Sequence, residues 1–492
     1  MIRKIKTFLF TNQTNRQTIA KNTFWLGVSN IGGRLIKAII IVYAARVLGA
    51  AEWGVFSYAV TLTAFLTVFT DFGINSILVR ESSRTENAEE RSRLLSTSFL
   101  IKCVMLTFGV ILIIFVAPLM TSIEGVKEIL PIVAFILIFD TLREFGFALN
   151  KVFERMESEA GLFILTNVAI VVFGFVFLAI SPTIKAFAYS YAIGTGLGMM
   201  ATAWMLKKNI GRIFSDFNKK FVKPIVLTAW PFAISGVLGV LMINTDILII
   251  GNLLSAEDVG LYSAADRIIQ ILYVLPSMVV GGILPTFSRL AFTDNSKMRL
   301  TMENVIALLL LVAIPISVGG FLFGEEIIAL LFGNSYAGAA SSFQILALTL
   351  MFNFPAVILS SAIFAYNRQR ALIVNAAVAG GANVVLDLIL IPSMGIFGSA
   401  IATFSAQIFS NIYLWNKMKS INYFKVWPYL KKVVIATVVM AIFILATKGL
   451  HLGIGFGIPV AILIYFGILL FLKEKLISDL KSVWHSTFKP VT

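Results

Sequence analysis

The chain is poor in the residues that metal sites and redox centres depend on. Its 492 residues include one cysteine, Cys103, and two histidines, and charged residues make up only 13%. A single cysteine excludes an intrachain disulfide and a cysteine-rich metal site. Two histidines are too few to form a proton relay through a helical bundle. We therefore expect no metal site and no cofactor, and any proton coupling would have to use carboxylates.

Long polar segments are also missing, which leaves no room for a soluble catalytic or motor domain. The sequence contains no GxxxxGK[ST] phosphate-binding loop, so an ATP-driven pump is not expected. Membrane glycosyltransferases need acidic catalytic residues on a sizeable external loop, whereas the gaps between the apolar stretches are short here. We expect no catalytic residues, and a protein that is not an enzyme.

Apolar stretches fill the chain instead. Hydrophobic residues make up 58% of it, and fourteen segments approach the roughly 20 residues that a helix needs to cross a bilayer. The predicted spans are 23–47, 54–79, 94–118, 128–150, 160–180, 185–206, 224–251, 260–286, 301–323, 336–366, 371–391, 396–416, 433–447 and 452–472. The sequence therefore predicts an all-α polytopic membrane protein with about fourteen transmembrane helices.

Positive charge is distributed unevenly among the gaps between these spans. The formal net charge is +15, and Lys and Arg concentrate in the termini and the even-numbered gaps, whereas the odd-numbered gaps hold only Lys127, Lys185 and Lys448. Because cationic loops stay on the cytoplasmic side, we expect a multi-pass protein of the cytoplasmic membrane with both termini in the cytoplasm. The cations are dispersed without a contiguous basic face, which argues against a nucleic-acid partner.

The chain also carries an internal duplication. LGAAEWGVFSYA (48–59) and LSAEDVGLYSAA (254–265) are identical at five of twelve positions with an offset of 206, and a weaker match pairs 181–192 with 391–402. An interval of six crossings returns the chain to the same side, so the copies have parallel topology and should be related by a pseudo-two-fold axis along the membrane normal. We interpret Gly54 and Gly260 as turn residues, and Glu52 and Asp258 as acidic residues near the start of the next helix.

The duplication predicts the domain organisation. Spans one to six and seven to twelve should each form a six-helix lobe, and two C-terminal helices lie outside the repeat. The predicted parts are an interfacial cytoplasmic segment at 1–22, an N-lobe at 23–206, a cytoplasmic linker at 207–223, a C-lobe at 224–416, and the last two helices with a cytoplasmic tail at 417–492.

Several motifs of the sequence resemble those of a known family of transporters. RVLGAAEWGVFSYA with TDFGINSILVRESSR, NTDILIIGNLLSAEDVGLYSAADRI and GIFGSAIAT resemble the polysaccharide-exporter branch of the multidrug/oligosaccharidyl-lipid/polysaccharide exporter superfamily, which contains the O-antigen-type flippases. The resemblance implies a two-lobe carrier that flips polyprenyl-pyrophosphate-linked oligosaccharide by alternating access. It also implies membrane lipid and polysaccharide assembly enzymes as partners.

Cations inside the predicted spans are the candidate substrate-binding residues, because ionisable groups are costly in the bilayer. Arg34 and Lys37 share one face of the first span, and no acidic residue of that span neutralises them. Arginine can bind a pyrophosphate bidentately while lysine adds a point charge. Asp71 on a neighbouring helix could pair with both instead. The two glycines that precede Arg34 predict a bend there.

Lys102 and Arg267 could extend the basic cavity. Lys102 could instead extend to the inner interface, and Arg267 adjoins Asp266 without needing to pair with it. A third group, Asp140, Arg143 and Glu144, has the spacing of a self-neutralising cluster.

Carboxylates inside the spans are the candidate ion-coupling residues. Asp71, Asp246 and Asp387 are isolated in sequence, and Asp266 joins them as a candidate. Burial favours reversible protonation, while neighbouring Asn and Thr side chains could supply oxygens for Na⁺. Position alone also allows a solvated helix-end role for Asp246 and Asp387.

Three functions follow from these features. The first is a flippase for lipid-linked oligosaccharide, by alternating access with Na⁺ or H⁺ coupling. The second is a Na⁺- or H⁺-coupled antiporter for small organic cations, which would need an acidic or aromatic cavity and is disfavoured by Arg34 and Lys37. The third is a non-transporting membrane scaffold of an envelope-assembly complex, in which unneutralised charge inside the membrane would have no use.

Overall fold

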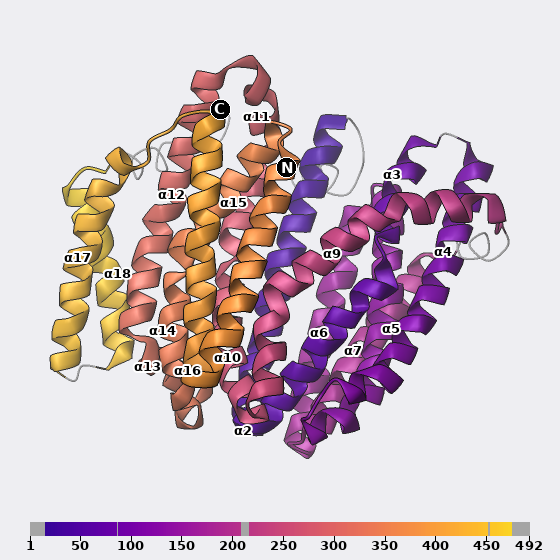
Figure 1. Cartoon of the computed structure of the whole chain (residues 1–492), viewed down its shortest axis with the longest axis horizontal. Coiled ribbons are helices and arrows are strands. Elements are labelled where there is room, and N and C mark those ends of the chain that lie inside the picture. Colours follow the sequence, from indigo (N-terminus) through magenta and orange to yellow (C-terminus); the bar gives the residue numbers. More distant parts are fainter. Residues whose placement is uncertain (1–14, 86, 208–215, 451–452, 475–492) are drawn as a thin grey trace, which may run out of the picture. The chain divides into compact units, whose positions relative to one another are not determined.

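The computed structural model describes residues 15–85, 87–207, 216–450 and 453–474, and all regular elements in these ranges are helices (Figure 1). Eight of the described helical stretches are long and apolar enough to cross a membrane. The protein is therefore an all-α polytopic membrane protein, as the sequence predicts. The number of fourteen crossings stays a prediction.

Contacts between Cα atoms divide the chain into two compact units, residues 1–263 and 264–492. The division falls inside α10 (Ala256–Leu272) and not in the predicted linker. Its position follows from α9 (Lys219–Leu253), which packs against α2, α3 and α4 and is thereby joined to the first unit. The lobes predicted from the duplication are a different division of the chain, and they stay a prediction.

Unit 1 is a bundle of long helices joined by short turns. Besides α9 and the start of α10 it contains α2 (Asn15–Asp71), α3 (Ile74–Arg84), α4 (Ala88–Ile111), η1 (Leu112–Val116), η2 (Ala117–Leu119), α5 (Glu124–Val152), α6 (Met156–Ile180) and α7 (Ile184–Met205). α2 packs mainly against α6, and α7 packs against α5 and α6. A short amphipathic helix, α3, separates from α2 at Gly73, which is left-handed with φ 76°.

Unit 2 is a second helical bundle. Besides the end of α10 it contains α11 (Val274–Thr293), α12 (Asn295–Leu322), α13 (Gly324–Phe332), η3 (Asn334–Ala339), α14 (Ala340–Leu348), α15 (Leu350–Ala365), α16 (Gln369–Ile421), α17 (Trp427–Gly449) and α18 (Ile454–Phe471). α12 and α16 both pack against α15, and the last two helices pack against each other, with α17 also against α12.

Two glycines divide the longest helices into two limbs each. Gly49 in α2 has φ 77° and ψ 170°, and Gly395 in α16 has φ 60° and ψ −144°. Only glycine adopts this backbone region readily, because a Cβ would clash there. α2 therefore covers the first two predicted spans and α16 covers the eleventh and twelfth.

Hydrogen bonds and ion pairs of unit 1 bring the odd-numbered gaps together at one end of the bundle. The Ile184 backbone N–H donates to Glu52 Oε2 at 2.9 Å, which joins the first gap to the fifth. Lys185 Nζ lies 2.8 Å from Glu128 Oε2, which joins the fifth gap to the end of the third. These contacts agree with a topology in which odd gaps share one side.

The even-numbered gaps of unit 1 are joined in the same way. Lys21, at the start of the first span, forms a 2.8 Å ion pair with Glu157 in the fourth gap. Ser92 in the second gap donates to Asp216 in the sixth. Even-numbered gaps therefore contact each other, and odd-numbered gaps contact each other, as the charge pattern predicts. Which end of the bundle faces the cytoplasm stays a prediction.

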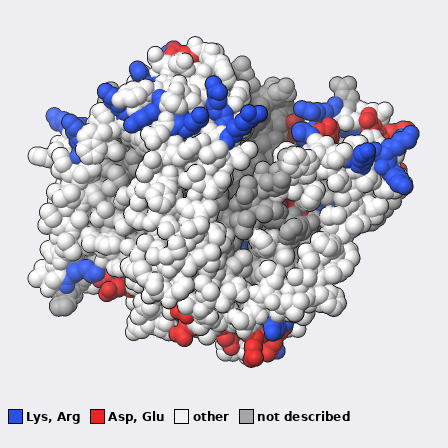
Figure 2. All heavy atoms as spheres, in the orientation of Figure 1, with Lys and Arg blue, Asp and Glu red and all other residues white. Residues whose placement is uncertain are grey.

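In unit 2 the even gaps meet around a hydrogen-bonded cluster. The Tyr366 hydroxyl donates to Asn295 Oδ1 at 2.8 Å, and Asn422 Nδ2 donates to the Tyr366 hydroxyl and to the Asn295 carbonyl, both at 2.9 Å. Figure 2 shows Lys and Arg gathered at the end of unit 2 that carries the α11–α12 turn. The neighbouring Asp294 caps α12, and the Lys297 backbone N–H holds the pKa of this carboxyl below its ordinary value.

The two duplicated turns pack directly on each other inside unit 1. A Cβ at Gly54 would overlap the Ala256 carbonyl oxygen, and a Cβ at Gly260 would overlap the Ala50 carbonyl oxygen. Since 50 and 256 are separated by the same 206 residues as 54 and 260, the two contacts are equivalent by pseudo-two-fold symmetry. Both glycines are helical, so they serve close packing rather than the turn that we expected.

The bend predicted at Gly32 and Gly33 is wrong. α2 is regular through both glycines, since its one non-helical residue in the described chain is Gly49. Gly33 instead lets α6 approach, because a Cβ there would overlap the Phe163 ring. Of the predicted interfacial segment 1–22, residues 15–22 belong to α2 and residues 1–14 lie outside the described residues. The interfacial location of this segment stays a prediction.

Candidate functional site

The first limb of α2 presents Arg34 and Lys37. Arg34 is exposed, and Lys37 is half-buried with its Nζ 4.7 Å from the centre of the Tyr191 ring on α7. Among the described residues, no carboxylate lies within ion-pair distance of either cation. The sequence left open whether Asp71 pairs with them, and the structure shows a different partner for Asp71.

The geometry of α2 explains why these two side chains stay available. Gly33 is pressed against Phe163 and Asn167 of α6, so the neighbouring Arg34, about 100° further round the helix, points away from that contact. Lys37 follows one turn later on the same face and rests on the negative face of Tyr191, a favourable cation–π arrangement. The pair offers an exposed guanidinium beside an ammonium, with no anion paired to either in the described part of the chain.

Lys102 and Asp71 form an ion pair between α4 and the end of α2. The Lys102 side chain is 1% exposed and the Asp71 side chain 38%. Asp71 is therefore not the isolated carboxylate that the sequence indicated, and Lys102 does not extend to the interface. A lysine already neutralised by a carboxylate has less to offer an anionic ligand than Arg34 has.

Arg267 and Asp266 lie at the centre of α10, in unit 2. Arg267 Nη1 donates to Gln270 Oε1 at 3.2 Å, and Gln270 Nε2 donates to Asp266 Oδ2. Gln270 therefore links the two charges, which do not pair directly. Arg267 is half-buried, and the remaining N–H groups of its guanidinium can donate hydrogen bonds to a ligand.

Asp246 near the end of α9 is buried and accepts a 2.6 Å hydrogen bond from the Tyr262 hydroxyl of α10. A buried carboxylate held by a neutral donor differs from the solvated helix-end residue that its sequence position allowed. Tyr262 belongs to the second copy of the duplicated turn, so this turn also fixes the orientation of an acidic group.

Asp387 on α16 is fully buried, which likewise excludes a solvated helix-end role. Asn383 lies one turn earlier on the same face, and its Nδ2 donates to Thr403 Oγ1 on the other limb of α16 at 3.3 Å. A carboxylate, an amide oxygen and a hydroxyl are the hard oxygen ligands that alkali and alkaline-earth cations prefer. Among the described residues, no three His, Cys, Asp or Glu side chains cluster as a metal site.

Arg143 confirms the self-neutralising cluster predicted on α5. Its Nη2 lies 3.0 Å from Asp140 Oδ1 and 3.3 Å from Glu144 Oε1. This arrangement neutralises a buried guanidinium within one helix, and we assign it to structure.

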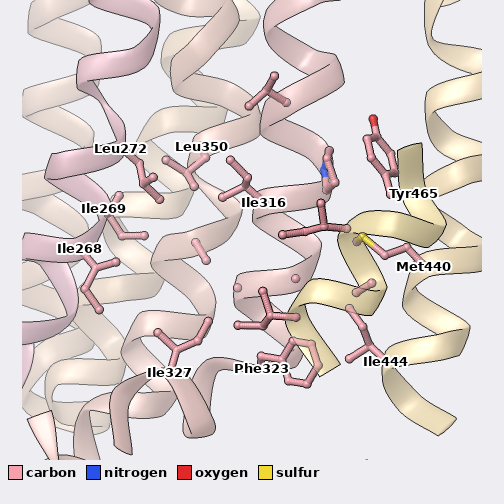
Figure 3. Close-up of a pocket in the computed structure, with 18 of the residues that line it drawn as sticks. Ile268, Ile269, Leu272, Ile316, Phe323, Ile327, Leu350, Met440, Ile444 and Tyr465 are labelled. Carbon is pink, nitrogen blue, oxygen red and sulfur yellow. The ribbon is translucent and has the colours of Figure 1, made fainter. Parts of the chain in front are cut away.

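An apolar cavity of about 370 Å³ lies in unit 2 between α10, α12, α15, α17 and α18. Figure 3 shows Ile316 of α12 and Phe323, directly after the end of α12, together with Met440 and Ile444 of α17 at this cavity. Tyr465 of α18 also lines it, but its hydroxyl donates to the Leu311 carbonyl at 2.6 Å and is satisfied. The cavity can accept a hydrocarbon chain and offers almost nothing to a polar group.

Sequence reasoning missed the side chains that hold the candidates in place. Tyr191 under Lys37 and Tyr262 at Asp246 come from other helices, and no spacing rule connects them to their partners. Asn383 could have been found, because it precedes Asp387 by four residues and so shares its helical face. Thr403 lies in the GIFGSAIAT segment that carried part of the resemblance.

Comparisons with known proteins agree with this fold. A probable low-salt glycan biosynthesis flippase of Haloferax volcanii is 25% identical over 78% of this chain and 80% of its own length. A capsular polysaccharide biosynthesis protein of Staphylococcus aureus is 23% identical over 79% of this chain and 96% of its own length. The lipid II flippase MurJ superposes with a TM-score of 0.76 over 92% of this chain and 98% of its own, at 19% identity, which shows a shared fold.

Two family profiles match the sequence. The MatE profile matches residues 231–389, and the profile described as polysaccharide biosynthesis protein matches residues 19–291, which is more than half of the chain. The resemblance to the polysaccharide-exporter branch of the superfamily is thereby confirmed. This chain is a member of the polysaccharide biosynthesis protein family of membrane transporters.

Proposed function

We propose that this protein flips a lipid-linked, phosphorylated oligosaccharide across the cytoplasmic membrane by alternating access. The observation that carries the proposal is the pair of cations on α2, Arg34 and Lys37, for which the described residues supply no carboxylate. A cation inside an apolar helix costs about 2.5 to 3.5 kcal/mol on insertion scales, so it is kept where it has a ligand. A pyrophosphate supplies acceptor oxygens for both side chains.

The names of the relatives from Haloferax volcanii and Staphylococcus aureus, which refer to glycan flipping and capsular polysaccharide synthesis, support this substrate class.

The two other functions fit the described residues less well. An antiporter for organic cations needs an anionic or aromatic binding surface, and the cations on α2 would repel its substrate. A scaffold without transport gives the unneutralised charge of Arg34 no use. The flippase is the one hypothesis in which the charge on α2 has a ligand.

Ion coupling is part of the proposal. Asp387 is fully buried on α16, one turn after the buried Asn383 that donates to Thr403, and this setting suits either a sodium ion or a proton on the carboxyl. Asp246, held by Tyr262, is the second buried candidate. Asp71 is a weaker one, because Lys102 already neutralises it.

The test is a reconstitution in liposomes. A lipid-pyrophosphate oligosaccharide is placed in the inner leaflet, and its appearance outside is followed with a membrane-impermeant glycan-binding probe. Wild-type protein should accelerate this exposure over protein-free liposomes. Arg34→Ala should slow it by about tenfold or more, since a charge-assisted hydrogen bond contributes about 1.5 to 3 kcal/mol.

The matched control is Arg46→Ala, which removes an exposed arginine from the same limb of α2. It should flip at the wild-type rate. If wild-type protein gives no acceleration, or if Arg34→Ala equals wild type, the proposed function is wrong. A parallel efflux assay with organic cations distinguishes the antiporter.

A further inference from the structure

A polar cavity of about 550 Å³, distinct from the apolar one, lies at the end of unit 2 that carries the α15–α16 turn. Its lining includes three cations, Arg368, Arg370 and Lys417, and the polar side chains of Asn367 and Tyr413. We call these five residues the basic pocket. All belong to the α15–α16 turn or to α16, so the pocket is separate from Arg34 and Lys37.

Local structure brings the three cations of the basic pocket together. α15 ends at Ala365, and Asn367 takes the left-handed conformation with φ 57°, which asparagine tolerates better than most residues. The chain reverses there, and α16 starts at Gln369. Ser410 Oγ donates to Asn375 Oδ1 at 2.9 Å and joins the two limbs of α16. Lys417, two turns beyond Ser410, is thereby brought to the side of the cavity opposite the turn.

The basic pocket is electropositive without compensation. Its lining contains no Asp or Glu, and none of its three cations forms an ion pair within the described chain. The N-terminus of α16 adds partial positive charge, because no side chain caps it. Three like charges around one cavity repel each other, and a bound anion relieves that repulsion.

The basic pocket also has an exposed apolar side. Val374 lines the pocket and is 46% exposed, and Ile373 beside it in α16 is 60% exposed. Further along α16, Lys419 Nζ lies 6.0 Å from the centre of the Trp415 ring, and aromatic and basic side chains are typical of the membrane interface. A ligand in the pocket can therefore extend hydrocarbon chains over Val374 and Ile373.

We propose that the basic pocket binds the phosphodiester headgroup of an anionic phospholipid, with its acyl chains along Val374 and Ile373. Arg368 and Arg370 would bind the phosphate oxygens through charge-assisted hydrogen bonds, and Lys417 would add a point charge. A soluble phosphate shares this chemistry but has no use for the exposed apolar side chains. The proposal does not depend on the identity of the flipped substrate.

The experiment is native mass spectrometry of the full chain, released from micelles that contain phosphatidylglycerol and phosphatidylcholine of equal chain length. Wild type should retain phosphatidylglycerol preferentially. The triple variant Arg368→Gln, Arg370→Gln, Lys417→Gln should lower that preference by about tenfold or more, because each cation near a lipid surface contributes roughly a several-fold change in affinity. All three substitutions change side chains that line an open surface pocket, and circular dichroism checks that the helices remain.

The matched control removes the same charge elsewhere, with Lys219→Gln, Lys223→Gln and Lys431→Gln, all exposed cations outside the basic pocket. The control should keep the wild-type preference. Equal losses in both triple variants would show a diffuse charge effect and overturn the proposal, as would an unchanged preference in the pocket variant. Displacement of the lipid by millimolar inorganic phosphate would assign the pocket to a soluble anion and also overturn it.

Discussion

Lys102 shows how a charge is accommodated among apolar helices. Its side chain is almost completely buried, whereas the side chain of its partner Asp71 is 38% exposed. Removal of Asp71 and removal of Lys102 should therefore have different effects on stability. An unpaired Lys102 would stay buried and unneutralised, but an unpaired Asp71 could be hydrated.

This asymmetry gives a prediction about stability. Asp71→Asn should lower the free energy of unfolding by about 2 to 4 kcal/mol, since it leaves a buried charge without a partner. Lys102→Met should cost about 1 kcal/mol, because the remaining carboxylate reaches water. The measurement is thermal unfolding in detergent.

The double variant Asp71→Asn, Lys102→Met serves as the control for this prediction. It should be close to Lys102→Met in stability, and it should still flip substrate if the ion pair is structural. Equal costs for the two single variants would contradict the asymmetry. Loss of flipping in a stable double variant would return both residues to the substrate or ion pathway.

Among the elements, the two duplicated turns in unit 1 approach each other closely at Gly54 and Gly260. The Ser263 hydroxyl donates to the Ser57 hydroxyl at 3.2 Å, and these serines are again 206 residues apart. Two glycine contacts and a serine pair related by one symmetry operation form a defined surface. Any larger side chain at Gly54 or Gly260 meets backbone, which cannot move aside as a flexible side chain can.

Gly54→Ala should therefore destabilise the protein by about 1 to 3 kcal/mol, the usual cost of overpacking. Alanine otherwise favours a helix by about 1 kcal/mol over glycine. Gly161→Ala on α6 is the matched control, because nothing lies within 4 Å of a Cβ at that position. It should leave thermal stability unchanged or raise it. Equal behaviour of the two variants would show that the repeats do not pack as described.

Much of the helical organisation could be predicted from the sequence, for a physical reason. Hydrophobic length fixes a span, and the alternation of cationic gaps fixes its direction, so both are properties of local sequence. The bend expected at Gly32 and Gly33 was wrong because a glycine in a helix serves equally well for close packing, as Gly33 does against Phe163. The real break at Gly49 lies inside the duplicated turn.

The site could be predicted only in part. Arg34 and Lys37 stand out because an uncompensated charge in an apolar span is visible in sequence. Their relation to Tyr191, and the pairing of Lys102 with Asp71, depend on which helices are neighbours. Asp71 and Lys102 are 31 positions apart in the sequence, so no local pattern predicts that they form an ion pair.

For the whole molecule, the buried carboxylate of Asp387 makes ion coupling testable. Asp387→Asn keeps the shape of the side chain but removes the charge and the titratable proton. A tenfold ion gradient supplies about 1.4 kcal/mol, so wild-type flipping should respond to it by up to about tenfold. The variant should flip at the same rate with and without Na⁺ and H⁺ gradients in proteoliposomes.

The control for Asp387 is Asp294→Asn, which changes a partly exposed carboxylate that caps α12. Asparagine caps a helix as well as aspartate does, so this variant should keep the wild-type response to the gradients. A gradient response that survives in Asp387→Asn would remove this residue from the coupling mechanism. It would leave Asp246 as the buried carboxylate to test.

The central claim is that Arg34 and Lys37 bind the phosphate of a lipid-linked substrate. The most direct measurement compares the affinity of the purified protein for a polyprenyl-pyrophosphate oligosaccharide with that for its phosphate-free analogue. Wild type should prefer the phosphorylated lipid by about 10- to 100-fold, and Arg34→Gln, Lys37→Gln should reduce this preference to within a few-fold. An unchanged preference in the double variant would contradict the claim.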